Sequence, residues 1–190
     1  MSTLSTTPGR IATLEAQRLL EVPVDGGFGV WLDEHWRDEL HALLLACAED
    51  VLLVTGEPPG PETAARILAG EPALRSLEDL FVVGVFDADQ RLAGILVVVR
   101  DQPHAGEWTV EFLLVRPDQR GRGLAGEMLR QLESWVASEG GTAILLTARR
   151  DNLAGEGFAR RAGFVASREH PTTAVRVVHA PARGAPHSGL

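Results

Sequence analysis

Residues 115–126 combine glycine and arginine at a spacing that suits anion binding, Val-Arg-Pro-Asp-Gln-Arg-Gly-Arg-Gly-Leu-Ala-Gly. An apolar, strand-like segment precedes them at residues 110–115, and a helical pattern follows at residues 124–136. The first N–H groups of a helix have no internal partner and lie at the positive end of its dipole. Glycine lets the backbone approach an anion without a Cβ in the way. The stretch therefore predicts a phosphate-binding turn.

The kinds of phosphate ligand can be narrowed from the same residues. A dinucleotide site of the Rossmann type needs a parallel βαβ start, but antiparallel strands are expected before this turn. A Walker loop needs Gly-Lys-Ser/Thr, and the chain has no lysine. A pyrophosphate on the amides of residues 121–126 fits, with Arg116, Arg120 and Arg122 able to add positive field. The alternative is an ordinary strand–turn–helix in which the glycines allow tight packing.

Composition limits the possible partners. The 190 residues carry a net charge of −8, which argues against nucleic acid and suits either a cationic partner such as an amine or simple solubility. All 18 basic residues are arginine, so each arginine is weaker evidence for an anion contact than usual. No apolar run is long enough to span a membrane. The single cysteine, Cys47, predicts a buried core thiol and a reducing compartment, and we expect a cytoplasmic protein.

The pattern of elements predicts one domain at residues 11–180 between flexible ends at 1–10 and 181–190. An amphipathic helix is expected over residues 33–49, capped by Asp33, with an apolar face of Trp36, Leu40, Leu43, Leu44 and Cys47. Another helix is expected at 61–68, and a last one, capped by Asp151, runs to about 162. A turn is expected at 25–29, and strands at 11–22, 80–86, 91–100, 107–115, 142–148, 164–169 and 173–179.

Two motifs carry a resemblance to a known family. The run Val115-x-Pro117-x-x-Arg120-Gly-Arg-Gly-Leu-Ala125 resembles the acyl-CoA-binding motif of the GNAT superfamily of N-acetyltransferases. Asn152, followed by Gly163-Phe164 eleven and twelve residues later, resembles the family's N-x-x-A…Y-x-x-x-G-F segment. The expected order of elements agrees over residues 11–179.

The resemblance implies an α+β, three-layer fold with a mixed, mostly antiparallel sheet of six to seven strands and helices on both faces. It also implies that strands 107–115 and 142–148 splay apart around the pantetheine arm of acetyl-CoA, a gap that usually involves a bulge. The activity implied is direct transfer of an acetyl group to a primary amine in a ternary complex, without a metal. The cofactor residues implied are Leu113, Leu114, Val115, Arg120, Gly121, Arg122, Gly123, Leu124, Ala125, Gly126 and Asn152.

Within that site, a backbone N–H near Leu114 or Val115 is expected to stabilise the oxyanion. Asn152 is interpreted either as a bond to the coenzyme arm or a backbone carbonyl, or as part of the cap of the last helix.

Glu111 is the first candidate for general base, because it is a carboxylate inside an otherwise apolar strand. Regular alternation puts it on one face with Leu113 and Val115. A solvated glutamate at an exposed edge is the alternative reading. Glu107 and His104, at the start of the same strand, are weaker candidates that read better as surface turn residues.

The main departure from the family pattern is Ala159, which stands where the family has a tyrosine that protonates the leaving thiolate. The chain has no tyrosine at all. Water, or the ammonium formed on the substrate, would have to supply that proton. The departure also motivates a second hypothesis, a non-catalytic acyl-CoA-binding or regulatory module of the same fold. The sequence leaves monomer and homodimer open, and it does not identify the amine.

Overall fold

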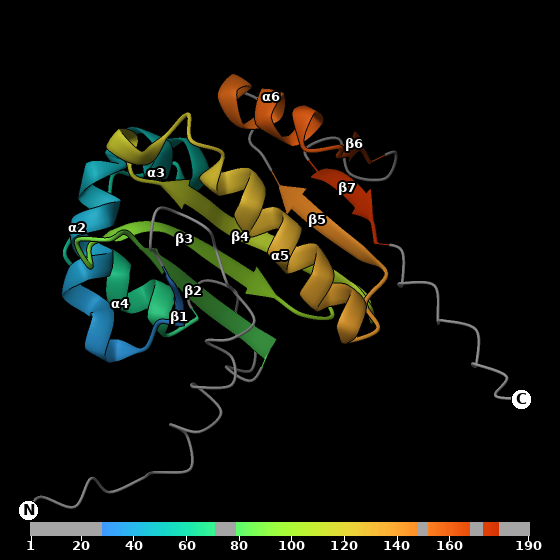
Figure 1. The fold of residues 1–190 in the computed structure, drawn as a ribbon, viewed down its shortest axis with the longest axis horizontal. Helices are drawn as coiled ribbons and strands as arrows, with labels where there is room; N and C mark the ends of the chain where they lie inside the picture. The colour runs from blue at the N-terminus through green and yellow to red at the C-terminus, as the bar shows by residue number, and fades with distance from the viewer. Residues whose placement is uncertain (1–27, 71–78, 148–151, 168–172, 179–190) are drawn as a thin grey trace, which may run out of the picture.

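The structure is a computed structural model that describes residues 28–70, 79–147, 152–167 and 173–178. For residues 28–30, 147 and 173–177 it describes the backbone alone. Figure 1 shows these segments as one sheet with helices packed against it. None of the helices within the described ranges is long and apolar enough to cross a membrane.

The described strands form one seven-stranded sheet in the order β1-β2-β3-β4-β5-β7-β6. Every neighbouring pair is antiparallel except β4 and β5, which are parallel. The strands are β1 (Phe28–Trp31), β2 (Leu80–Phe86), β3 (Leu92–Val99), β4 (Glu107–Val115), β5 (Ala143–Thr147), β6 (Val165–Ala166) and β7 (Thr173–Val177). A helix connects β4 to β5, as a parallel pair requires. The predicted mixed, mostly antiparallel fold is confirmed.

Helices cover both faces of the sheet and make two cores. The first core lies under α5 (Leu124–Ser138) and α6 (Leu153–Arg161), where Met128, Leu132 and Phe164 are buried. The second lies under α2 (Arg37–Ala46), α3 (Ala48–Thr55) and α4 (Thr63–Leu68). Strand β3 is buried along its whole length because some of its side chains enter one core and others enter the other core. Figure 1 shows α5 lying across the near face of the central strands.

Two short 3₁₀ helices complete the described elements, η1 (Glu34–Trp36) and η3 (Pro117–Gln119). The predicted single helix at 33–49 is wrong in detail. Asp33 caps η1 by accepting a hydrogen bond from the His35 N–H at 3.0 Å, and the helix that follows breaks at Cys47. The apolar face nevertheless continues across the break to Val51, which is fully buried. The helical segment ends at Gly56, whose φ of 85° is the left-handed conformation that glycine adopts at a helix end.

Other boundaries also differ from expectation. Part of the predicted turn at 25–29 is strand, because β1 starts at Phe28 and pairs with β2. Helix α4 begins at Thr63, two residues after the predicted start. The predicted strand at 164–169 is only the short β6 among the described residues. The predicted strand at 11–22 and the predicted cap Asp151 lie outside the described residues.

Candidate active site

Strands β4 and β5 pair over only part of their length. The register runs from Glu107 with Ala143 to Val110 with Leu146, and no later residue of β4 pairs with the described part of β5. On its other edge, β4 stays paired with β3 as far as Val115. Among the described residues, the second half of β4 therefore has one unpaired edge, which is the predicted splay.

A β-bulge marks the point where the two strands separate. Val97 of β3 pairs with Phe112 and Val98 pairs with Val110, so Glu111 is the extra residue on β4. The bulge shifts the alternation of side chains. Val110 lies in the core under α5, Phe112 lies in the opposite core, and Leu113 packs against the first core again. The expected bulge is present, and it is centred on the candidate base.

The backbone groups that face the splayed gap follow from the pairing with β3. The Arg116 N–H donates to the Ala93 carbonyl at 2.8 Å, so the backbone N–H of residue 116 points towards β3. The backbone N–H and C=O groups of successive residues point to opposite edges of a strand. Those of Leu114 therefore also point towards β3, whereas those of Leu113 and Val115 point into the gap. Of the two residues named for the oxyanion donor, the alternation favours Val115.

The glycine turn has the backbone geometry of an anion site. Gly121 and Gly123 have φ of 76° and 83°, in the left-handed region that side chains rarely adopt. A Cβ placed on either residue, or on Gly126, would meet nothing within 4 Å. Packing against the protein therefore does not explain these glycines. Helix α5 starts at Leu124 with no side-chain cap, so its first amides have no partner from a capping residue.

One pocket of about 550 Å³ contains nearly all the predicted site residues. A volume of this size is typical of small-ligand sites. Glu111 and all the implied cofactor residues line the pocket except Arg122, whose guanidinium donates to the Gln119 side-chain oxygen at 3.3 Å. The lining residues that the sequence analysis missed are Asp50, Val54, Val110, Gln119, Leu146, Ala154, Gly155, Phe158 and Arg161. Four of these lie on α6, at a spacing that a helical wheel drawn from the second motif would have placed on one face.

Glu111 is half-buried in the wall of this pocket. Burial raises the pKa of its carboxyl group above the ordinary value, because the charged form is poorly solvated there. Within the described part of the chain, no side chain donates a hydrogen bond to this carboxylate or forms an ion pair with it. A carboxylate with these properties can accept a proton from a group in the pocket.

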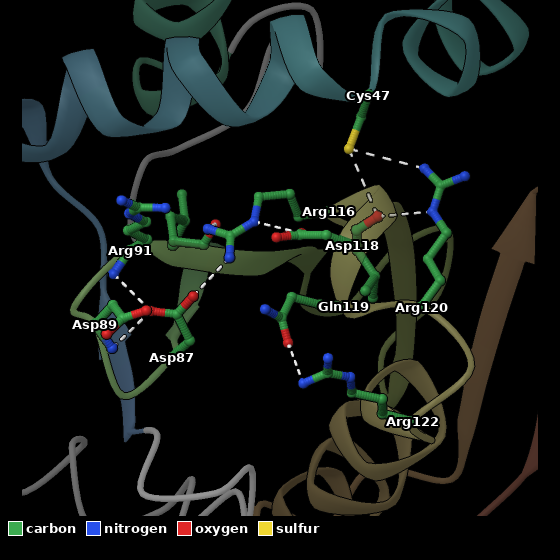
Figure 2. Close-up of polar contacts among 11 residues, drawn as sticks. Cys47, Asp87, Asp89, Arg91, Arg116, Asp118, Gln119, Arg120 and Arg122 are labelled. Atoms are coloured by element: carbon green, nitrogen blue, oxygen red, sulfur yellow. Dashed lines mark hydrogen bonds and ion pairs between the residues drawn. The ribbon is translucent and has the colours of Figure 1, made fainter.

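Arg120 is held by groups from other elements, and Figure 2 shows its guanidinium beside the Cys47 thiol. Its guanidinium contacts the Asp50 carboxylate of α3 at 2.5 Å and donates from Nε to the Val115 carbonyl at 3.0 Å. The Cys47 thiol also contacts that carbonyl, at 3.6 Å between Sγ and O. The positive charge expected from Arg120 is therefore largely balanced by Asp50.

Arg116 does not line the pocket, although it was expected to add positive field there. It forms ion pairs of 2.6 Å with Asp87 and with Asp118. Asp87 also accepts the backbone N–H groups of Asp89 and Arg91, which fixes the turn between β2 and β3 (Figure 2). Burial opposes ionisation of Asp87, but the backbone N–H of Arg91, the Arg116 guanidinium and the backbone N–H of Asp89 together hold the pKa of its carboxyl group below the ordinary value. Arg116 therefore ties the end of β4 to a neighbouring turn.

Cys47 is a core residue, as predicted, with 1 % of its surface exposed. Burial is the main cause that raises the pKa of its thiol, while the Arg120 guanidinium opposes the shift. A thiol kept neutral in this way is a poor nucleophile. The contact with the Val115 carbonyl shows that the residue closes the end of the splayed segment.

Asn152 caps α6. Its side-chain oxygen accepts the Gly155 N–H at 2.8 Å, and a Cβ on Gly155 would lie 2.7 Å from the Asn152 side-chain nitrogen. The capping interpretation is therefore confirmed for the side-chain oxygen of Asn152. The N-cap position of α6, which was expected to be Asp151, is occupied by Asn152. Asn152 also lines the pocket, so its side-chain NH₂ group remains a candidate donor to a ligand.

At the tyrosine position of the family pattern, Ala159 is 3 % exposed and belongs to the core under α6. Its neighbour Phe158 lines the pocket instead. Among the lining residues, the ionisable groups are Asp50, Glu111, Arg120 and Arg161. The described wall of the pocket thus has no hydroxyl or thiol that could protonate a leaving group.

Comparisons with known proteins find acetyltransferases, both by family model and by fold. The family model for the acetyltransferase (GNAT) family matches residues 37–164. The fold resembles an acetyltransferase from Thermus thermophilus, with 22% identity, a TM-score of 0.66 and coverage of 80% of this chain and 96% of that one. No curated protein matches the sequence.

Two further structures have the same fold. One is an acetyl transferase from Salmonella typhimurium that modifies the N-terminal serine of a 50S ribosomal subunit protein, L7/L12 (18% identity, TM-score 0.65, covering 80% of this chain and 95% of that one). The other is the spermidine N-acetyltransferase from Vibrio cholerae in complex with CoA and spermine (12% identity, TM-score 0.62, covering 81% and 96%). At these identities the likeness shows the fold alone. The fold and the family model together define an acyltransferase. The chain belongs to the GNAT acetyltransferase family.

Proposed function

We propose that this protein is an N-acetyltransferase that moves the acetyl group of acetyl-CoA directly to a primary amine in a ternary complex. The observation that carries the proposal is the single pocket in which the free edge of β4, the glycine turn and the start of α5 meet. A thioester with a long pantetheine arm and a pyrophosphate needs those three features together. The free strand edge pairs with the amides of the arm, and the turn takes the pyrophosphate.

The chemistry assigns roles to the chain's own groups. The neutral amine attacks the acetyl carbonyl carbon, a C–N bond forms, and negative charge develops on the carbonyl oxygen. The Val115 N–H points into the gap and stabilises that charge. Glu111 takes the proton that the nitrogen loses, directly or through water. The C–S bond then breaks, and the leaving thiolate takes a proton from water, because Ala159 offers none. If the thiolate takes the proton of the nitrogen instead, Glu111 takes its proton from the entering ammonium before the attack.

The acceptor is an amine of a small molecule or of a peptide. Both classes occur among proteins of this fold, as spermidine and as the N-terminal serine of a ribosomal protein. Asp50 and Glu111 give the pocket two carboxylates, which favour a cationic amine as it enters.

The second candidate function is a module that binds acyl-CoA without transferring the acyl group. Ala159 favours it, because the site lacks the group that the family pattern uses to protonate the thiolate. Both functions require the protein to bind acyl-CoA, but only the transferase would pass the acyl group to an amine.

The test is a thiol-release assay with acetyl-CoA against a panel of polyamines, amino acids and short peptides, beside calorimetric titration with CoA. We expect CoA binding and amine-dependent thiol release by at least one acceptor. Tight CoA binding with no release for any amine, and no effect of Glu111→Gln on hydrolysis, would favour the binding module. Absence of any CoA binding would refute both.

A further inference from the structure

Two arginines line the pocket, and within the described ranges only Arg120 has a partner. Arg120 is bonded to Asp50 and to the Val115 carbonyl. Arg161 also lines the pocket, and nothing in the described part of the chain forms an ion pair or a hydrogen bond with its guanidinium. Among the described lining residues, the cation left free to bind a ligand is therefore Arg161, which comes from α6 and not from the glycine turn.

The position of Arg161 on α6 directs it towards the pocket. Ala154, Gly155, Phe158 and Arg161 lie within two turns of one helix face, and all four line the cavity. A Cβ built on Gly157 would lie 3.4 Å from a terminal nitrogen of Arg161, so the guanidinium folds back along the preceding turn. Long side chains in helices take this direction because Cα–Cβ bonds tilt towards the N-terminus. Arg160, the next residue back, is exposed and does not line the pocket.

The charge of the pocket explains why this cation matters. The lining has two carboxylates, Asp50 and Glu111, and two guanidinium groups, Arg120 and Arg161. Without Arg161 the balance would be one net negative charge facing a polyanionic coenzyme. The start of α5 supplies amides for one anionic group. Coenzyme A has a second one, the phosphate monoester on the 3′ position of its ribose, which carries about −1.5 to −2 charges near pH 7, as other phosphate monoesters do.

We propose that Arg161 is the subsite for the 3′-phosphate of coenzyme A, so that the protein selects CoA over 3′-dephospho-CoA. This inference rests on the proposed acyl-CoA function. A planar guanidinium binds a phosphate monoester through two parallel, charge-assisted hydrogen bonds. Two anion sites on different elements, the glycine turn and α6, bind the two anionic parts of one coenzyme molecule.

The test is calorimetric titration of wild type, Arg161→Gln and Arg160→Gln with CoA and with 3′-dephospho-CoA. We expect the wild type to bind CoA about tenfold more tightly than 3′-dephospho-CoA, a ratio that corresponds to about 1.4 kcal/mol. Arg161→Gln should lose most of that preference by weakening CoA alone. Arg160→Gln removes the same charge from the neighbouring position and should behave as wild type.

Several outcomes overturn the subsite. One is a wild type that binds both coenzymes equally, and another is an Arg161→Gln variant that keeps the preference or weakens both ligands alike. An equal loss in Arg160→Gln would indicate a general effect of charge on α6. If the wild type binds 3′-dephospho-CoA and CoA equally well, the coenzyme function stands and only the subsite fails. If it binds neither, the proposed function itself fails. Because Arg161 is exposed, circular dichroism should show unchanged folding in both variants.

Discussion

At the scale of the residue, the ionisation of Glu111 should make the rate of acetyl transfer depend on pH. Its carboxyl pKa is raised by burial, and general-base catalysis needs the ionised form. We expect kcat/KM to fall as pH drops below that raised pKa. Glu111→Gln should lower kcat/KM about a hundredfold and remove this acid limb of the profile. Steady-state rates between pH 5 and 9, with an acceptor found by thiol release, measure both effects. A variant that keeps the acid limb would assign the titration to another group.

The same substitution should stabilise the fold. A carboxyl with a raised pKa holds its proton more tightly when folded than when unfolded, so folding stability falls as pH rises from the unfolded to the folded pKa. Glutamine has no charge to bury, so Glu111→Gln should unfold at higher denaturant concentration at pH 8 than wild type. At pH 4 the two proteins should differ little. Urea titrations at the two pH values test this, and higher stability of wild type at pH 8 would contradict it.

Two glycines that flank α5 allow the cost of backbone strain to be measured separately from the loss of ligand binding. Gly123 before the helix and Gly140 after it have φ of 83° and 79°, and a Cβ on either would meet nothing within 4 Å. Alanine in this conformation costs roughly 1–2 kcal/mol, so Gly123→Ala and Gly140→Ala should lose similar stability. Only Gly123 lines the pocket, so only Gly123→Ala should weaken CoA binding, by about tenfold. Equal CoA affinity in the two variants would remove the glycine turn from the site.

At the scale of the element, two aspartate–arginine pairs hold the two residues that flank Pro117-Asp118-Gln119. The pair between Asp50 and Arg120 is partly exposed, at 36% and 46% of the side chains. The pair between Asp87 and Arg116 is mostly buried, at 11% and 15%. Exposed pairs contribute little to stability, whereas breaking a buried one leaves a charge without its partner. The first pair lies at the pocket and the second lies away from it.

Replacing the aspartate should therefore change CoA affinity at the first pair and folding stability at the second. Asp50→Asn frees Arg120 and removes a negative charge from an anion site, so CoA affinity should rise about threefold at low salt, with stability nearly unchanged. Asp87→Asn should cost roughly 1–3 kcal/mol of stability and leave CoA affinity unchanged. Calorimetry and urea unfolding on both variants give the comparison. Weaker CoA binding by Asp50→Asn would mean that the carboxylate positions Arg120 for the ligand.

At the scale of the whole molecule, sequence patterns predicted most of the sheet and the turn. The ends of strands β2, β3 and β4 were predicted to within about a residue. Apolar runs rich in β-branched residues and bounded by turn residues are typical of strands. The break at Cys47 was not predictable, because the apolar period continues through it to Val51. Asp50 and Arg161 were also missed. Asp50 lies in no motif and reaches the pocket through tertiary packing of α3, whereas Arg161 occupies a variable position inside the second motif, where the pattern specifies no residue type.

The splay also sets how ligand binding should act on the whole fold. Beyond Val110 and Leu146 the two parts of the sheet are joined by no described strand pairing, so a coenzyme in the gap would bridge them. At a concentration of 100 Kd, CoA should stabilise the folded state by about 2.7 kcal/mol. For a chain of this size that corresponds to a rise in Tm of about 5–10 °C.

Hydrogen exchange can locate the effect of that ligand along β4. The Leu114 N–H points towards β3 and should exchange slowly with or without CoA, whereas the N–H groups of Leu113 and Val115 face the gap and should become protected only when CoA is bound. ATP at the same concentration serves as the control for a bare polyphosphate and should change neither amide. A thermal shift with CoA but no new protection at Leu113 and Val115 would mean that the coenzyme occupies the glycine turn without entering the gap, and direct acetyl transfer at Glu111 would then be refuted.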